Sequence, residues 1–485
     1  MLENYEPKAV WKFFEEISYI PRGSGNEKGI SDYLVEFAKK RNLLVHQDET
    51  LNVIIKKSGS SGYENAPKVI IQGHIDMVCE KDKETVHDFE KDPLKLIVEG
   101  DYIKACGTTL GADDGIAVAL ALALLDSSEI AHPPIEALFT TGEEMGLIGA
   151  NALDGKLLEG RMLINIDSEE EGVFTVSCAG GVRADLVWDV EYVNVEQNHK
   201  ALNLKIQGLQ GGHSGTQIQK ERANANRLIG RALRILESKY GILFTGISGG
   251  SKDNAIPREA EAIIVFESCK MDEIAEEVKA INEVFESEFA ITDEAVQIFL
   301  EEREKDREVK QVFTRELCRN IISALMLLPN GVQANSFNIE GLVETSSNIG
   351  ILQMTDKEVI ISSALRSSVP SRKEMLVEQI KIVGELTNAR FGRRGDYPAW
   401  EYNKDSELRE KAINVYTEMF GSKPKIDAIH AGLECGCFAE RIDGVDMISM
   451  GSDLYDAHTP QERLSISSSR RTWEFLQKLL IELAV

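Results

Sequence analysis

Short apolar strand patterns that alternate with amphipathic helical patterns over about the first 180 residues place the strongest constraint on the fold. We expect strands at residues 52–56, 68–72, 135–140 and 162–166, and helices at residues 8–19, 27–40 and 116–125. This alternation predicts an α/β sheet covered by helices. Ligands of such sheets bind where the strands end, so the residues that follow each strand are the candidates for a site.

Acidic residues and a histidine follow two of these predicted strands. The strand at 135–140 leads into Glu143 and Glu144, and an earlier strand leads into His74 and Asp76. Two neighbouring carboxylates repel each other, so burying both requires a cation or a proton. One of them could bind a metal while the other serves as a free base; the alternative is an acidic turn in solvent. His74 and Asp76 would share one face of their strand, which suits an imidazole ligand held by a carboxylate.

Four further residues have side chains that a metal site could use. Asp113 and Asp114 stand between glycine-containing segments before an Ala/Leu-rich helix, Asp167 ends a strand, and His458 lies near the C-terminus. Each of these residues alone could be structural. Together with the two strand ends they make five positions with suitable side chains, and the combination favours a site for two metal ions.

Length and charge narrow the class of protein. A chain of 485 residues exceeds the size that one hydrophobic core supports, so we expect two domains. No apolar run approaches the ~20 residues that span a bilayer, and the N-terminus lacks a signal-peptide pattern. The sequence therefore predicts a cytoplasmic protein without membrane contact. Its formal net charge of −26 argues against a nucleic-acid partner, because nucleic acids select basic surfaces.

The seven cysteines are scattered and odd in number, which does not fit a disulfide framework. Cys435-Gly436-Cys437 could be read as half of a zinc site, but no second cysteine pair accompanies it. We expect free, packed thiols.

Over nearly its whole length the chain resembles the co-catalytic zinc peptidases related to aminoacylases and glutamate carboxypeptidases, and most closely their aminoacyl-histidine (Xaa-His) dipeptidase branch. The resemblance is carried by segments in a matching order, at residues 73–78, 110–116, 141–146, 166–169, 211–215, 254–258, 366–368 and 430–436. It implies a two-domain α/β enzyme in which an α+β lid domain is inserted into the catalytic domain.

The predicted elements agree with an inserted domain. Beyond about residue 182 we expect strands at 201–206, 261–267, 337–344, 346–353 and 358–366, and helices at 222–238, 271–287, 310–327, 371–387 and 406–420. The segment 392–398 looks like a boundary loop. Because His458 follows that loop, the chain must return to the first domain. We therefore expect the catalytic domain at residues 1–184 and 393–485, with the lid at 185–392.

The family pattern implies a role for each candidate ligand. One zinc ion would be bound by His74, Asp113 and Asp167, and the other by Asp113, Glu144 and His458, with Asp113 bridging. Glu143 would be the general base that activates a metal-bridging water, and Asp76 would orient His74. The resemblance also implies a cis peptide between Asp113 and Asp114. Cobalt or manganese could replace zinc, because the same ligands accept all three metals.

The resemblance assigns substrate contacts to the lid and to the loop after His430. His213 would stabilise the oxyanion that forms during attack, either in its own subunit or in the partner of a homodimer. Arg366 would bind the terminal carboxylate, the alternative being a surface salt bridge, and Asn254 would also hold the substrate. Gly432 and Glu434 would shape the pocket.

Three functions follow from these observations. The first is a di-zinc dipeptidase acting on small unblocked peptides, Xaa-His dipeptides included. The second is a broader aminopeptidase, tripeptidase or amide deacylase on the same scaffold. The third is a non-catalytic homologue, which would require the loss of a ligand or of Glu143, and the sequence retains all of them.

Overall fold

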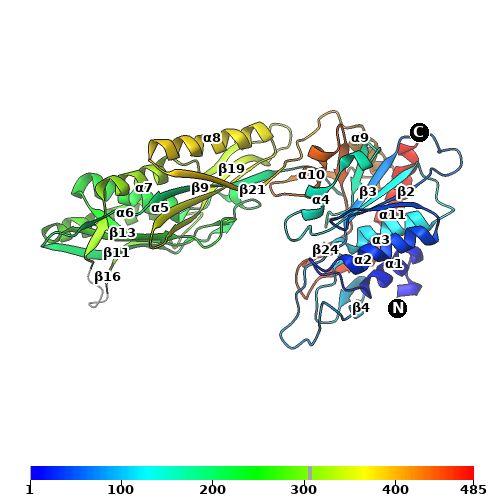
Figure 1. The fold of residues 1–485 in the computed structure, drawn as a ribbon, viewed down its shortest axis with the longest axis horizontal. Helices are drawn as coiled ribbons and strands as arrows, with labels where there is room; N and C mark the ends of the chain where they lie inside the picture. Colours follow the sequence, from blue (N-terminus) through cyan, green and yellow to red (C-terminus); the bar gives the residue numbers. More distant parts are fainter. Residues whose placement is uncertain (1, 304–308) are drawn as a thin grey trace. The chain divides into compact units, whose positions relative to one another are not determined.

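The computed structural model describes residues 2–303 and 309–485, and its contacts divide the chain into two compact units (Figure 1). Unit 1 comprises the residues up to Cys178 together with Tyr402–Ala428 and Leu433–Val485, and unit 2 comprises Ala179–Glu401 and Ile429–Gly432. The predicted boundaries at 184/185 and 392/393 fall inside two strands, β9 (Gly180–Asp189) and β21 (Arg390–Tyr397). These strands pair with each other, which explains why both belong to unit 2.

An eight-stranded sheet forms the centre of unit 1, in the order β1-β2-β6-β3-β7-β23-β8-β22. Its strands are β1 (Leu44–Gln47), β2 (Val53–Lys57), β3 (Val69–His74), β6 (Ile135–Thr140), β7 (Met162–Asn165), β8 (Val173–Cys178), β22 (Lys425–Ile429) and β23 (Asp446–Ser449). β3 runs parallel to both β6 and β7. The carboxyl ends of these three strands therefore meet at one edge of the sheet.

Helices cover this sheet. They are α1 (Lys8–Ser18), α2 (Lys28–Lys40), α3 (Ala112–Asp126), α4 (Ile148–Ala152), α9 (Glu407–Phe420), α10 (Glu434–Arg441) and α11 (Ile466–Leu483). α3 packs against β3 and α1, whereas α9 packs against β23 and α11. Every residue of β3 and β6 is buried, as expected for central strands covered on both faces.

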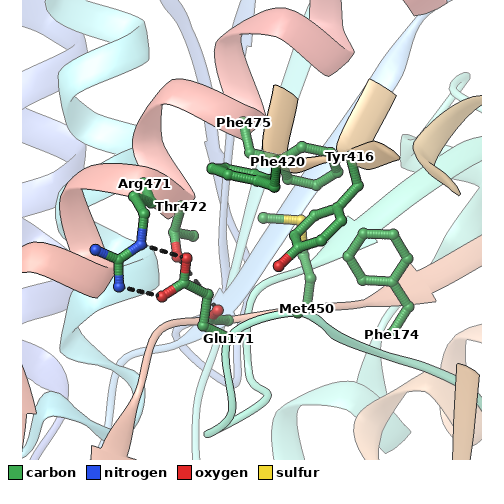
Figure 2. Close-up of a pocket in the computed structure, with 10 residues that line it drawn as sticks. Glu171, Phe174, Tyr416, Phe420, Met450, Arg471, Thr472 and Phe475 are labelled. Carbon is green, nitrogen blue, oxygen red and sulfur yellow. Dashed lines mark hydrogen bonds and ion pairs between the residues drawn. The ribbon is translucent and has the colours of Figure 1, made fainter. Parts of the chain in front are cut away.

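An aromatic cluster fixes the C-terminal helix of unit 1 to the sheet (Figure 2). Phe174 of β8 stacks on Phe475 of α11 at a ring-centroid distance of 5.4 Å, and Tyr416 of α9 meets both rings edge-on. Arg471 donates two hydrogen bonds of 2.6 Å to Glu171 beside them. These contacts hold α11 in place, and with it the segment that leads into this helix.

A smaller sheet of unit 1 holds that returning segment. Its order is β24-β25-β5-β4, with β4 (Leu96–Glu99), β5 (Tyr102–Ala105), β24 (Leu454–Tyr455) and β25 (Arg463–Ser465). β25 pairs with β5 in antiparallel register. The loop between β24 and β25, which contains His458, is therefore fixed at both of its ends.

Unit 2 is built on a nine-stranded antiparallel sheet in the order β16-β11-β15-β13-β19-β20-β9-β21, with β18 also paired to β19. Besides β9 and β21, its strands are β11 (His199–Gln207), β13 (Leu243–Gly249), β15 (Ala260–Glu267), β16 (Gln297–Glu302), β18 (Gly331–Asn335), β19 (Val343–Met354) and β20 (Glu358–Ser367). Two short pairs join β10 (Tyr192–Asn194) to β17 (Gln311–Phe313) and β12 (Gly212–His213) to β14 (Ala255–Ile256).

In the described part of unit 2 there are four α-helices: α5 (Ala225–Tyr240), α6 (Met271–Glu288), α7 (Arg315–Leu327) and α8 (Pro370–Leu386). α5 contacts both α6 and α7, and α7 contacts α8, so the four helices form one layer (Figure 1). Their apolar faces share a single core with the sheet. This is the α+β architecture expected for the inserted domain.

Three predictions for unit 2 were wrong in detail. The expected boundary loop at 392–398 is mostly strand β21, an exposed edge strand whose polar, glycine-containing sequence lacks apolar alternation. The helix predicted from residue 310 begins at Arg315, because the Thr314 hydroxyl accepts the N–H of Leu317 and caps it there. Most of the strand predicted at 337–344 is irregular, and the strands lie on either side of it.

Two predictions concern cysteines and membranes. All seven cysteines are free thiols, and Cys435 and Cys437 are buried in α10. The expectation of free, packed thiols for this pair is confirmed. No helix in the described ranges has both the length and the apolar character needed to cross a membrane.

Candidate metal centre

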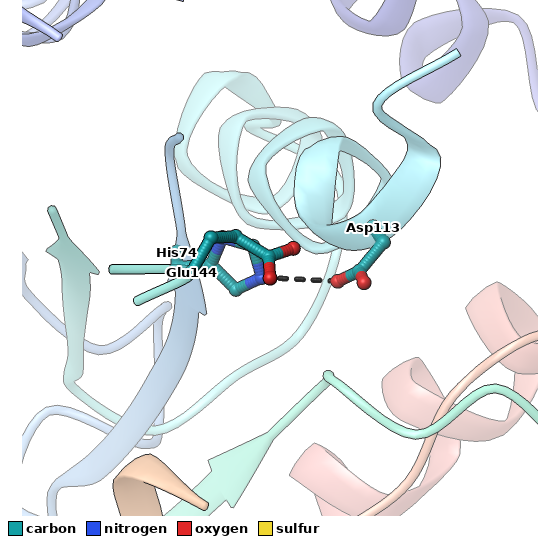
Figure 3. A group of neighbouring side chains, drawn as sticks. All are labelled: His74, Asp113 and Glu144. Carbon is teal, nitrogen blue, oxygen red and sulfur yellow. Dashed lines mark hydrogen bonds and ion pairs between the residues drawn. The ribbon is translucent and has the colours of Figure 1, made fainter. Parts of the chain in front are cut away.

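The five predicted ligands come together at the carboxyl edge of the unit 1 sheet. They are His74 at the end of β3, Glu144 after β6, Asp167 after β7, Asp113 at the start of α3, and His458 between β24 and β25. Ligand atoms of His74, Asp113 and Glu144 lie within 4.8 Å of one another (Figure 3), as do those of His74, Asp114 and Asp167. The shared edge of the parallel strands β3, β6 and β7 thus gathers residues that are far apart in the sequence.

Asp113 lies between two histidines. Its Oδ1 is 3.0 Å from Nε2 of His74, and its Oδ2 is 3.0 Å from Nε2 of His458. Nε2 of His458 is also 2.8 Å from Oε1 of Glu144, and Nε2 of His74 is 3.7 Å from Oδ1 of Asp167. The side chains therefore form two groups that share Asp113, one oxygen facing each group.

Asp76 supports two of the ligand segments. Its Oδ1 is 3.4 Å from Nδ1 of His74, and its two oxygens accept the backbone N–H groups of Glu143 at 3.1 Å and Glu144 at 3.3 Å. The Ser24 hydroxyl also donates to it at 2.8 Å. Asp76 is fully buried, so it is not a turn acid in solvent. Asp76 therefore fixes the position of the His74 ring relative to the Glu143–Glu144 turn.

Asp114 supports His74 from another direction. The peptide bond between Asp113 and Asp114 is cis, as the resemblance implies. Asp114 is buried, and its Oδ2 accepts the backbone N–H of His74 at 3.2 Å. Asp114 therefore contributes to the placement of His74 in addition to lying near Asp167.

The electrostatics of this cluster favour a bound cation. Burial raises the pKa of Glu143 to about 8, against the opposing charge of His74, and burial with the Asp114 charge raises the pKa of Asp167. Hydrogen bonds to Asp113 and Glu144 raise the pKa of His458 to about 10. The positive charge on the histidines is therefore too small to stabilise all of the buried carboxylates. Divalent cations would supply that charge, and imidazole and carboxylate groups are ligands that zinc takes.

Two buried residues that the sequence did not reveal bind the backbone beside the candidate ligands His74 and Asp113. Arg22, between α1 and α2, donates to the carbonyls of Ile75 and Asp76 at 3.1 Å and also to the carbonyl of Gly111. Glu462 accepts backbone N–H groups of the loop that leads into Asp113. The only sequence signal for Glu462 is its position four residues after His458.

His213 lies in unit 2 and presents a fixed hydrogen-bond donor. Its Nδ1 accepts the backbone N–H groups of Gly215 at 3.2 Å and Thr216 at 3.1 Å, which places the ring proton on Nε2. Burial, together with the charge of Arg366, lowers the pKa of His213. The imidazole is therefore neutral at neutral pH, with its Nε2–H free of these contacts.

Arg366 is buried, and no acidic side chain of the described residues pairs with it. Its Nη1 donates to the Tyr397 hydroxyl at 2.7 Å, its side chain is only 5% exposed, and its buried Nε has no hydrogen-bond partner in the described part of the chain. Across residues 2–303 and 309–485 it forms no ion pair, so the structure lacks the surface salt bridge considered as the alternative. A Cβ on Gly215 would lie 3.2 Å from this Nε and 2.6 Å from the His430 carbonyl, so a side chain there would crowd Arg366.

Asn254 is held beside His213. The N–H of Ser214 donates to the Asn254 carbonyl at 2.9 Å, and Asn348 Nδ2 donates to the carbonyls on either side of Asn254, at 3.2 and 2.9 Å. Asn254 and His213 both line a cavity of about 820 Å³ within unit 2. These two predicted substrate residues therefore share one supported surface.

Gly432 and Glu434 lie in different units. A Cβ on Gly432 would come within 2.8 Å of the Tyr397 ring, so this position accepts only glycine without a shift of the ring. Glu434, the first residue of α10, is fully buried and accepts hydrogen bonds from Gln72 at 2.6 Å and Thr140 at 2.8 Å. Glu434 was expected in a loop, but it lies in α10. Its side chain contacts β3 and β6.

Comparisons with known proteins agree with this architecture. Residues 70–482 match the peptidase family M20/M25/M40. The cytosol non-specific dipeptidase of Escherichia coli is 36% identical over 482 residues, which cover 99% of each chain. The crystal structure of aminoacylhistidine dipeptidase from Vibrio alginolyticus has a TM-score of 0.95 and 37% identity, covering 99% of this chain and 98% of that one.

A more distant structure shows the fold alone. Aminopeptidase PepT from Bacillus cereus has a TM-score of 0.58 at 16% identity, over 99% of this chain and all of that one. The family match and the full-length relative are decisive for classification. The chain belongs to the peptidase family M20/M25/M40, and it is a two-domain metallopeptidase that hydrolyses peptide bonds.

Proposed function

We propose that this chain is a cytoplasmic, homodimeric dipeptidase that hydrolyses unblocked dipeptides, Xaa-His dipeptides included, with two divalent metal ions as cofactors. The observation that carries the proposal is Asp113, whose two oxygens each face a different histidine. The substrate class is supported by two full-length relatives, one named a cytosol non-specific dipeptidase and the other an aminoacylhistidine dipeptidase.

The donor set fits two zinc ions, with cobalt or manganese as substitutes. His74 and Asp167 would hold one ion, Glu144 and His458 the other, and Asp113 both. When bound, such a pair of ions polarises the substrate carbonyl and makes a water molecule more acidic.

Glu143 would do the proton transfer. It stands next to the ligand Glu144, and its backbone N–H is fixed by Asp76. Its carboxylate would take a proton from the attacking water and give it to the leaving amine, a step that needs a basic group at that place. The Nε2–H of His213 would donate to the oxygen that gains negative charge, and Arg366 would bind the terminal carboxylate of the dipeptide.

A panel of peptides tests the substrate class. Metal-loaded enzyme should hydrolyse free dipeptides, including Ala-His, far faster than the same dipeptides with an acetylated amino group or an amidated carboxyl group. Efficient cleavage of tripeptides or amidated dipeptides would instead assign the chain as an aminopeptidase. Release of acetate from acetylated amino acids would assign it as a deacylase.

Arg366→Ala should raise the KM for free dipeptides most, lowering kcat/KM by about 10- to 100-fold, the usual loss for hydrogen bonds to a charged group. The same change should matter little for amidated substrates, which have no carboxylate to bind. Arg394→Ala is a matched control, because this exposed arginine of unit 2 pairs with Asp185. An equal loss on free and amidated substrates would remove Arg366 from carboxylate recognition.

His213→Ala should lower kcat by about 10²- to 10³-fold, the usual loss for one oxyanion donor, with metal content unchanged. Unchanged turnover would remove this residue from the reaction. Mixed dimers of His213→Ala and Glu143→Gln chains then assign the subunit. Recovered activity means that His213 acts in the partner's site, because only then does one site contain both groups.

A further inference from the structure

Glu462 binds the loop that carries Asp113 through four backbone N–H groups. Its Oε2 accepts from Leu110 at 2.7 Å and Gly111 at 3.0 Å, and its Oε1 accepts from Ala112 at 2.7 Å and Asp113 at 3.3 Å. Only 2% of the residue is exposed to solvent. Both oxygens of one carboxylate are thus used on consecutive amides of a single loop.

The same loop is held from a second direction by Arg22, which donates to the Gly111 carbonyl and is also buried. α3 begins at Ala112, and Asp113 and Asp114 have non-helical backbone angles inside its first turn. The helix therefore does not fix the Asp113 backbone through its own regular hydrogen bonds. The side chains of Glu462 and Arg22 supply fixed contacts at this point.

Glu462 also belongs to the segment that carries His458. It follows His458 by four residues and immediately precedes β25, which is paired to β5. The N–H of Glu462 donates to the Thr459 carbonyl at 3.1 Å, closing a turn next to His458. One short segment thus provides the candidate ligand His458 and also binds the loop that carries Asp113. Nε2 of His458 is 3.0 Å from Oδ2 of Asp113.

We propose that Glu462 is a positioning residue of the metal centre: it joins the Asp113 loop to the His458 segment, so that both keep the spacing that two ions require. The inference rests on the proposed metal centre and adds to it a residue outside the ligand set. Partners behind metal ligands commonly change metal affinity by 10- to 100-fold when they are altered.

Glu462→Gln is the sharpest change, because it keeps the shape of the side chain. An amide replaces one acceptor oxygen by an NH₂ group, which would face two backbone N–H donors. The loop would lose two of its four hydrogen bonds to this side chain, and no cavity would be created. Glu462→Asp keeps both oxygens but shortens the side chain by one methylene, and it serves as a second variant if the first does not fold.

The matched control is Glu136→Gln. Glu136 is equally buried in unit 1, and its Oε2 accepts the backbone N–H groups of Glu159 at 2.9 Å and Gly160 at 2.8 Å. It lies near the start of β6, whereas the ligands follow the end of that strand. Its change should affect stability without affecting the metal centre.

The test measures metal binding without peptide hydrolysis. Apo protein is titrated with Zn²⁺ against a chelator of known affinity, and with Co²⁺, whose visible spectrum reports ligand geometry. Glu462→Gln should weaken binding of both ions by about 10- to 100-fold and alter the Co²⁺ spectrum, and Glu462→Asp should shift both in the same direction. Glu136→Gln should match the parent in both measurements.

Parent-like Zn²⁺ affinity and Co²⁺ spectra in both Glu462 variants, together with reduced unfolding midpoints for the apo proteins, would overturn the inference and leave Glu462 a structural residue. Failure of the parent to cleave dipeptides would contradict the proposed substrate but not this inference. Failure of the parent to bind metal would overturn both.

Discussion

A Glu143→Gln enzyme is expected to lose about 10³- to 10⁴-fold in kcat for dipeptides while it keeps both metal ions. Glutamine has nearly the same shape as glutamate but cannot take a proton at neutral pH. The loss should fall on kcat and leave substrate binding largely unchanged, because a general base acts in the transition state. Stopped assays with metal analysis of the same sample measure both quantities.

Glu144→Gln is the matched control for this change, since the two residues are adjacent and both are anchored by Asp76. It should weaken metal binding, because Oε1 of Glu144 lies 2.8 Å from Nε2 of His458 and both residues are candidate ligands of the same ion. If Glu143→Gln loses metal and Glu144→Gln keeps it, the two carboxylates have been assigned in the wrong order.

Asp113→Asn should damage both metal sites at once and abolish measurable turnover. Each oxygen of Asp113 faces a different histidine, and an asparagine offers only one oxygen and no charge. Metal analysis after dialysis should find fewer than two ions per chain, with both affinities lowered.

His458→Ala should instead weaken mainly one ion, because this histidine contacts Glu144 and a single oxygen of Asp113. The difference in metal binding between Asp113→Asn and His458→Ala therefore tests whether Asp113 bridges the two ions. An Asp113→Asn protein that still holds two tightly bound ions would show that Asp113 does not bridge.

The sheet of unit 1 and the positions of the ligands could be predicted because two regular properties combine. Buried strands show as short apolar runs, and parallel strands end at the same edge, so His74, Glu144 and Asp167 had to be neighbours once β3, β6 and β7 were recognised. His458 follows none of these strands; as an isolated histidine it was one suitable position among five, and the resemblance implied its role as a ligand. The structure then placed its Nε2 at 3.0 Å from Asp113.

The supporting contacts could not be predicted, because they use the backbone as the partner. A carboxylate that binds amides, as Glu462 does, leaves no matching residue type elsewhere in the sequence. The same holds for Arg22 and the carbonyls it binds. The sequence of strand β21 is typical of a loop because an exposed edge strand, paired on one side only, needs no apolar alternation.

The most direct test of the account is a titration of metal-free enzyme with Zn²⁺, in which dipeptide hydrolysis is measured against the number of ions bound per chain. The shared carboxylate of Asp113 predicts that activity reaches its maximum only at two ions per chain and is lost again when a chelator removes them. Full activity with one ion per chain, or activity that persists after both ions are removed, would contradict a two-metal dipeptidase.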